Sequence, residues 1–247
     1  MRRYPSPSYT SMSFGPGPVT PAIKALIAIN VVVFLVQHLV SGLLETLGLT
    51  PADVVTRGYI WQVGTYMFVH TELIHLLFNM LTLWMFGTEL ERIWGTRYFT
   101  KFFLVTGAGA GALTVLFALL PIGPSEFVYR AIVIGASGAI YGLLLAYALY
   151  FPDRPILLFM LFPVAAKYAV TIYGLLALWL SFSERGGVAN ATHLAGLIVG
   201  YVFLKSGRIH PIAEIKYRYL KWKINRTRRK FDVYSGGRAD DWNRRVH

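Results

Sequence analysis

The run Gly-Ala-Ser-Gly-Ala-Ile-Tyr-Gly at residues 135–142 decides how the rest of this sequence is interpreted. It places one hydroxyl group, that of Ser137, among small residues near the start of the apolar segment 131–151. A serine among glycines in a membrane helix is commonly a packing device, because small side chains let two helix backbones approach closely. Ser137 has a further role only if a base and hydrogen-bond donors lie at the same depth.

The composition is that of a membrane protein. Of the 247 residues, 55% are hydrophobic and only 15% are charged, which is not the balance of a soluble domain. No cysteine is present, so disulfides, thiolate metal sites and a cysteine nucleophile are excluded. The Gly-x-Ser-Gly spelling also occurs in soluble hydrolases on a strand-to-helix elbow, but here no strand pattern precedes the serine.

Six apolar segments predict an all-α membrane protein built as a six-transmembrane-helix bundle. The segments are residues 25–44, 73–90, 98–120, 131–151, 166–182 and 191–204. The aromatic-rich connection 48–71 is predicted to lie in the membrane interface rather than in open water. Residues 156–162 are also predicted to be interfacial.

The positive charges predict the orientation of this bundle. With both termini cytoplasmic, all of the 24 lysines and arginines lie on the inner side except Arg57, Arg130 and Arg185. Cytoplasmic segments carry an excess of these residues, so this topology is strongly favoured. The net charge of +12 is therefore interpreted as a topology signal. Nucleic-acid binding is not predicted, since no recognition fold accompanies the charge.

The chain is predicted to have three parts. Residues 1–21 form a disordered lead without a removable signal peptide, and residues 22–205 hold the six spans. Residues 206–247 form a basic cytoplasmic tail. Its apolar residues Ile212, Ile215, Tyr219 and Trp222 recur at helical spacing, which predicts an amphipathic helix on an anionic inner leaflet, followed by disorder.

In this topology the even-numbered helices start at the outer face and bring polar side chains to one level. His75 and Asn79 fall in the first two turns of the second helix, Ser137 lies about six residues into the fourth, and His193 is near the start of the sixth. At 1.5 Å per residue, all four lie within roughly 10 Å of the outer helix ends. Intramembrane polar residues are costly and tend to mark function.

Ser137 and His193 together suggest nucleophilic catalysis. A serine hydroxyl is a weak nucleophile until a base takes its proton, and His193 lies at the depth to do so. A lone histidine, by contrast, would more often be a satisfied core residue. No aspartate or glutamate falls within the spans at that level, so a Ser-His dyad is predicted rather than a triad.

The neighbouring polar residues have both a catalytic and a structural interpretation. Tyr141 lies one helical turn after the serine, where its ring could hold the imidazole or simply pack. His75 and Asn79 could point donors at one spot, as an oxyanion hole requires, or could join two helices. A zinc site is the competing chemistry, but residues 70–75 lack the His-Glu-x-x-His spacing, and His70 and His75 would not share a helix face. No metal or cofactor is predicted.

Three motifs occur in order on the second, fourth and sixth spans. They are His75-Leu-Leu-Phe-Asn79, Gly135-Ala-Ser137-Gly138 and His193-Leu-Ala-Gly196. As an ordered set they resemble the rhomboid family of intramembrane serine proteases, and the resemblance covers roughly residues 22–205. It implies hydrolysis of peptide bonds in transmembrane protein substrates near the outer membrane interface.

The resemblance also implies roles for individual residues. Ser137 would be the nucleophile and His193 the general base, with the Tyr141 ring packed on His193. The oxyanion hole would be formed by His75, Asn79 and the Ser137 backbone amide. Supporting family positions are matched by Gly135, Gly138, Asn190 and Gly196, and Gly196 with Gly200 would let the sixth helix press against the fourth.

One departure and two alternatives accompany this interpretation. Some family members have Trp-Arg where this chain has Trp61-Gln62, so the polar contacts of that loop do not carry over. A catalytically inactive relative, which binds membrane proteins and assists their degradation, would have lost the serine or the histidine. A transporter would show ionisable residues through the midplane and paired repeats. The predicted location is the bacterial plasma (inner) membrane.

Overall fold

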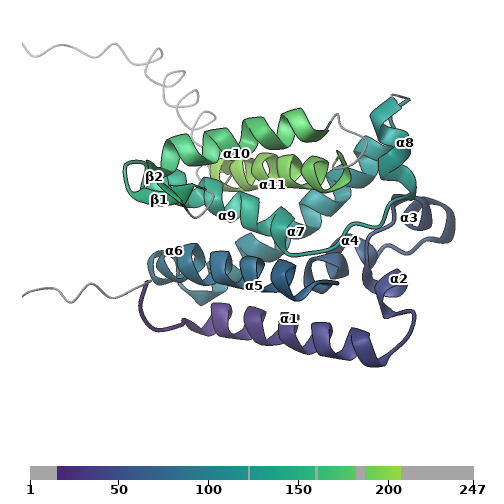
Figure 1. Cartoon of the computed structure of the whole chain (residues 1–247), viewed down its shortest axis with the longest axis horizontal. Helices are drawn as coiled ribbons and strands as arrows, with labels where there is room; N and C mark the ends of the chain where they lie inside the picture. The colour runs from purple at the N-terminus through teal and green to yellow at the C-terminus, as the bar shows by residue number, and fades with distance from the viewer. Residues whose placement is uncertain (1–15, 122, 159–160, 182–186, 207–247) are drawn as a thin grey trace, which may run out of the picture. The chain divides into compact units, whose positions relative to one another are not determined.

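The computed structural model describes residues 16–121, 123–158, 161–181 and 187–206, and these residues are mostly helical (Figure 1). Most of the predicted lead and of the predicted basic tail lies outside them. The helices are α1 (Pro21–Leu39), α2 (Leu43–Leu47), α3 (Pro51–Arg57), α4 (Gln62–Thr65), α5 (Leu73–Thr82), α6 (Thr88–Trp94), α7 (Thr96–Ala118), α8 (Gly123–Arg130), α9 (Ser137–Tyr150), α10 (Ala166–Ser181) and α11 (Gly187–Ser206). A short 3₁₀ turn spans Tyr66–Phe68, and a π turn spans Leu83–Gly87.

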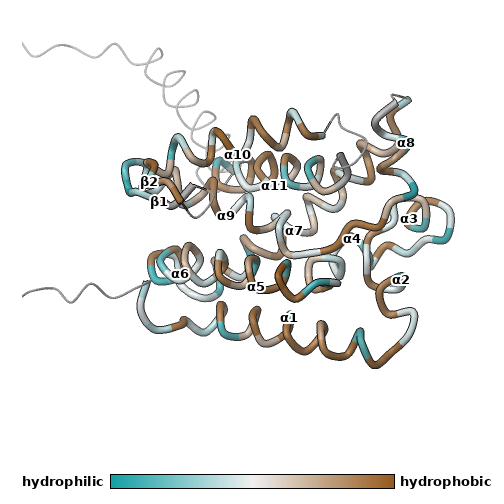
Figure 2. Tube along the Cα trace, viewed as in Figure 1, coloured by the Kyte–Doolittle hydropathy of each residue, from teal (hydrophilic) through white to brown (hydrophobic). Residues whose placement is uncertain are grey.

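Three helices of the described part could cross a membrane by length and composition. They are Pro21–Leu39, the continuous run Leu73–Trp94 and Thr96–Ala118. Helices α9 and α10 are apolar but shorter. Apolar residues dominate the long helices, whereas polar ones gather in the connections (Figure 2). The protein is thus a mainly helical membrane protein, and the number of six spans stays a prediction.

The fourth predicted span begins later than its hydropathy indicates. Residues 131–136 are not helical, and Val133 pairs with Leu49 in an antiparallel bridge through hydrogen bonds of 2.8 and 2.9 Å. Gly135 follows with a φ of +101°, a conformation that glycine adopts readily because it lacks a Cβ. The prediction that Ser137 lies six residues inside its helix is therefore wrong. Ser137 is the first residue of α9, and an extended segment does precede it.

The connection between α9 and α10 is a β-hairpin, a short exception within the mainly helical fold that the all-α prediction gave. Strand β1 (Pro155–Leu158) pairs antiparallel with β2 (Phe162–Ala165). Two prolines in this stretch, Pro155 and Pro163, disfavour a helix because each lacks an N–H donor and fixes φ. Residues 156–162, predicted only to be interfacial, therefore include parts of both strands.

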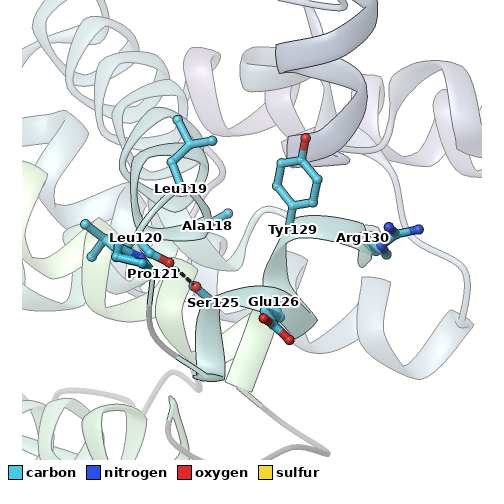
Figure 3. A pocket seen from close by; sticks show the side chains of 8 residues that line it. All are labelled: Ala118, Leu119, Leu120, Pro121, Ser125, Glu126, Tyr129 and Arg130. Carbon is cyan, nitrogen blue, oxygen red and sulfur yellow. Dashed lines mark hydrogen bonds between the residues drawn. The ribbon is translucent and has the colours of Figure 1, made fainter.

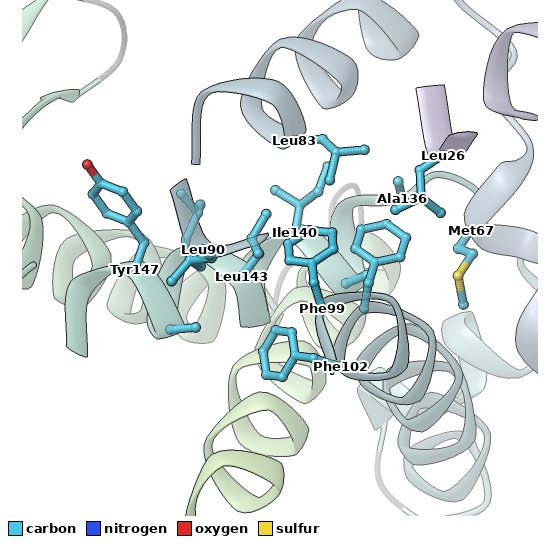
Figure 4. Close-up of a cluster of buried hydrophobic side chains, with 14 of the residues drawn as sticks. Leu26, Met67, Leu83, Leu90, Phe99, Phe102, Ala136, Ile140, Leu143 and Tyr147 are labelled. Carbon is cyan, nitrogen blue, oxygen red and sulfur yellow. The ribbon is translucent and has the colours of Figure 1, made fainter. Parts of the chain in front are cut away.

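Helix α7 runs through the middle of the helical body and packs against α9 (Figure 1). Its residues Phe99 and Phe102 are fully buried. Figure 4 shows them in the cluster that also contains Ile140 and Leu143 of α9. Because well-packed interiors leave little room for movement, this core fixes the helix that begins with Ser137.

The start of α1 is tied to the corner between α6 and α7 by Glu91, which is buried. Its carboxylate accepts hydrogen bonds from the N–H groups of Ala22 at 2.9 Å and Ile23 at 3.1 Å. It also accepts one from the Thr96 hydroxyl at 2.8 Å. The first N–H groups of a helix have no partner within the helix, so Glu91 satisfies donors that α1 itself cannot.

Candidate active site

Ser137 and His193 meet between α9 and α11. The Ser137 Oγ lies 2.8 Å from the His193 Nε2, a normal hydrogen-bond distance. In the neutral imidazole, one ring nitrogen is a donor and the other an acceptor. With the proton on Nδ1, the serine hydroxyl donates to Nε2. This is the arrangement in which a histidine can take the serine proton.

The two helices approach this closely because glycines face each other. A Cβ added to Gly196 on α11 would lie 1.9 Å from the carbonyl oxygen of Gly138 on α9. One turn further on, a Cβ on Gly200 would lie 2.9 Å from the Gly142 Cα. Both distances are shorter than any side chain tolerates. The structure thus has the close helix contact that the Gly-x-x-x-Gly spacing predicted.

Tyr141 lies flat on the ring of His193. The two ring centroids are 4.1 Å apart and the planes differ by only 6°. Within the described residues, the buried Nδ1 of His193 has no hydrogen-bond partner. The phenol ring therefore restrains the imidazole through its face, while Nδ1 lies at the edge of the ring. An aromatic face also attracts a cation, so it would stabilise an imidazolium.

The amide of Ser137 stands at the N-terminus of a 14-residue helix. The first N–H groups of such a helix lack partners within it, and the helix dipole makes this end positive. His75 lies beside the same turn, because a Cβ on Gly135 would meet its ring at 2.7 Å. The Asn79 amide donates to the His75 carbonyl at 2.8 Å, which uses one of its two N–H groups.

The turn that precedes Ser137 is held by a loop that the sequence did not single out for this purpose. The Gly135 N–H donates to the Tyr66 carbonyl at 3.0 Å, and the Ala136 N–H donates to the Nε2 of His70 at 3.4 Å. From the sequence, His70 is a candidate only for metal binding. The centroids of the His70 and His75 rings lie 4.9 Å apart. On one continuous helix, residues five apart would not share a face, but His70 precedes α5 and is free of that restriction.

The remaining predicted positions fall around this centre. Asn190 is half-buried on α11, three residues before His193. Gln62 stands where some family members have arginine, and its buried side chain holds the loop through two hydrogen bonds. Its Oε1 accepts the Thr50 N–H at 3.0 Å, and its Nε2 donates to the Glu45 carbonyl at 2.9 Å.

Other features of the described residues do not add to this site. No group of three or more histidines and carboxylates suited to a metal ion occurs among them. A depression of about 680 Å³ lies between the end of α7 and α8 (Figure 3). It is lined by Ala118, Leu119, Leu120, Pro121, Ser125, Glu126, Tyr129 and Arg130. Neither Ser137 nor His193 is part of it.

Fold and site define a class: helical membrane proteins with a serine–histidine pair held between two helices. Residues 57–206 match the family described as Rhomboid domain, which is more than half of the chain. The chain therefore belongs to the rhomboid family.

Several curated relatives are similar over most of the chain. Rhomboid protein 1, mitochondrial, of Saccharomyces cerevisiae is 34% identical over 196 residues, which cover 73% of this chain and 51% of the relative. RHOMBOID-like protein 2 of Arabidopsis thaliana is 30% identical over 203 residues, 78% of this chain and 56% of the relative. Rhomboid protease AarA of Providencia stuartii is 28% identical over 191 residues, which cover 71% of this chain and 68% of the relative. The chain thus spans about half the length of the first two.

Proposed function

We propose that the protein is an intramembrane serine endopeptidase that cleaves transmembrane protein substrates near the outer membrane interface. The observation that carries the proposal is the 2.8 Å contact between the Ser137 Oγ and the His193 Nε2. Membership of a family with members named as proteases supports it. A catalytically inactive binding scaffold is the second candidate, but it gives no reason for a serine and a histidine to be in hydrogen-bond contact.

The proposed reaction has two halves. In the first, His193 takes the Ser137 proton as Oγ bonds to the substrate carbonyl carbon, and the imidazolium then protonates the leaving amine. In the second, His193 takes a proton from a water molecule that attacks the ester carbonyl. The imidazolium then returns this proton to Oγ as the ester C–O bond breaks, which restores the serine. No carboxylate takes part, and the Tyr141 ring stacked at 4.1 Å orients the imidazole instead.

The negative charge that develops on the substrate carbonyl oxygen needs donors in place before the reaction. We assign this task to the Ser137 amide, His75 and Asn79. The amide stands at the positive end of α9. His75 lies against Gly135, two residues from the nucleophile, and Asn79 retains an N–H beyond the one given to the His75 carbonyl.

The proposed setting is a bundle of six spans with both termini cytoplasmic. In it, residues 22–205 form the catalytic domain and residues 206–247 a basic tail on the anionic inner leaflet. The prediction of a disordered lead over residues 1–21 is wrong at its end, because Pro21 is the first residue of α1 and Arg92 donates to the Pro18 carbonyl at 3.0 Å. The relatives come from a mitochondrion, a plant and bacteria, so they do not select one membrane. The bacterial plasma membrane stays a prediction.

The direct test is labelling with a fluorophosphonate probe, followed by cleavage of a generic single-span substrate. Wild type should be labelled at Ser137 and should cleave, whereas Ser137→Ala and His193→Ala should do neither. Ser181→Ala is the matched control, because that buried serine already donates to the Ala177 carbonyl at 2.6 Å. Labelling and cleavage that persist in Ser137→Ala would refute the assignment, and an unreactive wild type that binds substrate would favour the scaffold.

A further inference from the structure

We propose, building on the function above, that His70 is a positioning residue that sets the backbone turn carrying the nucleophile. Its imidazole would hold the Ala136 amide and support His75. In this way it would keep two of the proposed oxyanion donors in place, the Ser137 backbone amide and the His75 side chain, without touching the substrate.

The first observation is the complete burial of His70. The residue lies between the 3₁₀ turn Tyr66–Phe68 and α5, and its exposed fraction is 0%. A polar ring removed from solvent costs free energy unless its polar atoms find partners. A histidine at so buried a position is therefore stabilised only through the contacts that its ring makes with the surrounding chain.

The second observation is the contact that Nε2 makes. It accepts the Ala136 N–H at 3.4 Å, a long hydrogen bond. Because a backbone N–H can only donate, Nε2 must be unprotonated and the ring must carry its proton on Nδ1. The neutral ring thus serves as an acceptor, and the contact assigns its tautomer.

The third observation is the identity of the accepted group. Ala136 is the N-cap residue of α9, and no side chain of that helix caps it. An alanine cannot accept a hydrogen bond from its own helix start, as serine or aspartate does at this position. His70 satisfies the N-cap amide from another element. The next amide, that of Ser137, then stays available for a substrate oxygen.

The fourth observation is that both neighbours of this contact are also fixed. The preceding amide, of Gly135, donates to the Tyr66 carbonyl at 3.0 Å, so one loop holds two successive amides. On the other side, the His70 carbonyl accepts a hydrogen bond from the Gln37 side chain of α1. The His70 ring also meets the His75 ring edge-on, with centroids 4.9 Å apart and planes at 64°. His70 therefore joins α1, the nucleophile turn and His75.

A positioning role predicts an effect on turnover rather than on substrate binding. His70→Phe keeps a ring of similar size against His75 but removes the acceptor. We expect turnover and the rate of fluorophosphonate labelling to fall about tenfold to a hundredfold, less than the loss of a direct oxyanion donor. KM should change by less than about twofold, because no contact with bound substrate is lost. His70→Gln offers a carbonyl oxygen near the position of Nε2 and should recover much of the rate.

Two further variants keep the test decisive. His38→Phe is the matched control and should keep wild-type rates. His38 is exposed, and its ring contacts Phe34 of its own helix, with Nδ1 2.7 Å from the Phe34 carbonyl. If His70→Phe does not fold, Gln37→Leu decides. It removes the anchor of the loop and should lower turnover about two- to thirtyfold, with KM nearly unchanged. The thermal unfolding midpoint should fall modestly, because the His70 carbonyl loses its donor.

The outcomes separate this inference from the proposed function. All variants are assayed beside wild type and Ser137→Ala. If wild type labels at Ser137 and His70→Phe reacts equally fast, the inference is wrong and the proposed function stands. If both His70→Phe and His70→Gln show a lower rate, a changed KM and a lower thermal unfolding midpoint, His70 is only structural and the inference also fails. If Ser137→Ala remains active, the proposed function itself fails.

Discussion

Gly196→Ala should separate the two halves of the candidate site while adding only one methyl group. The added Cβ would lie 1.9 Å from the Gly138 carbonyl oxygen, and ordinary contact begins at 3.4 Å. The obstacle is backbone rather than a movable side chain. Helices α9 and α11 must therefore move apart by about 1.5 Å at this crossing, because neither backbone can yield locally in a packed interior.

The displacement carries His193 with it, because His193 lies one helical turn before Gly196. The present Nε2 to Oγ distance is 2.8 Å, and hydrogen bonds weaken beyond about 3.2 Å. A shift of about 1 Å in a catalytic group can cost about a hundredfold in rate. We therefore expect turnover to fall about a hundredfold or more. Overpacking should also lower the free energy of unfolding by about 1 to 3 kcal/mol.

The assay is fluorophosphonate labelling of Ser137 and cleavage of a single-span substrate in liposomes, with thermal unfolding measured alongside. Gly174→Ala is the matched control. A Cβ at that position would meet only the flexible Leu197 Cδ1, at 3.2 Å, so rate and stability should change little. If Gly196→Ala labels and cleaves as fast as wild type, the close crossing of α9 and α11 is not what brings Ser137 and His193 together.

Four further predictions concern the same site. Asn79→Ala should lower turnover by about 10² to 10³ with little change in folding, as the loss of one oxyanion donor does; normal turnover would make Asn79 a packing residue. Tyr141→Phe keeps the ring stacked on His193 and should remain active, whereas Tyr141→Ala should have a lower turnover. Equal turnover of these two variants in kinetic assays would contradict the orienting role of the ring. Activity in detergent should survive chelators, since loss that zinc restores would revive a metal site. Substrates with Gly or Pro near the outer end of their helix should be cleaved faster than all-Leu substrates in a product-formation assay. The reason is that Gly and Pro weaken a helix by about 1 to 3 kcal/mol. Cleavage near the inner leaflet would contradict the proposed topology.

Hydropathy alone was enough to locate the long helices. The predicted segment 98–120 corresponds to α7, which spans Thr96–Ala118, because a continuous apolar run of that length favours a helix. The predicted segment 166–182 corresponds to α10 in the same way. Small-residue spacing was similarly informative, since Gly196 and Gly200 do lie against α9.

The start of α9 was not predictable in the same way. An apolar run has the same hydropathy whether it is helical or extended, so hydropathy places residues 131–136 in the same predicted span as the helix that follows. What decides their conformation is the pairing of Val133 with Leu49, some eighty residues away in the chain. The role of His70 was hidden for the same reason. A contact between a loop side chain and the amide of a distant helix start leaves no periodic pattern in the sequence.

The late start of α9 has a chemical consequence that an earlier start would remove. If Ser137 were six residues inside a helix, its amide would donate to the carbonyl four residues earlier and could not bind a substrate oxygen. At the first position of the helix, the amide is free and faces the positive end of the dipole. The extended segment and the positive φ of Gly135 therefore do more than shorten the span. They leave the Ser137 amide without a partner in its own helix, so that it can bind the substrate oxygen while the hydroxyl of the same residue attacks the carbonyl, as the proposed reaction requires.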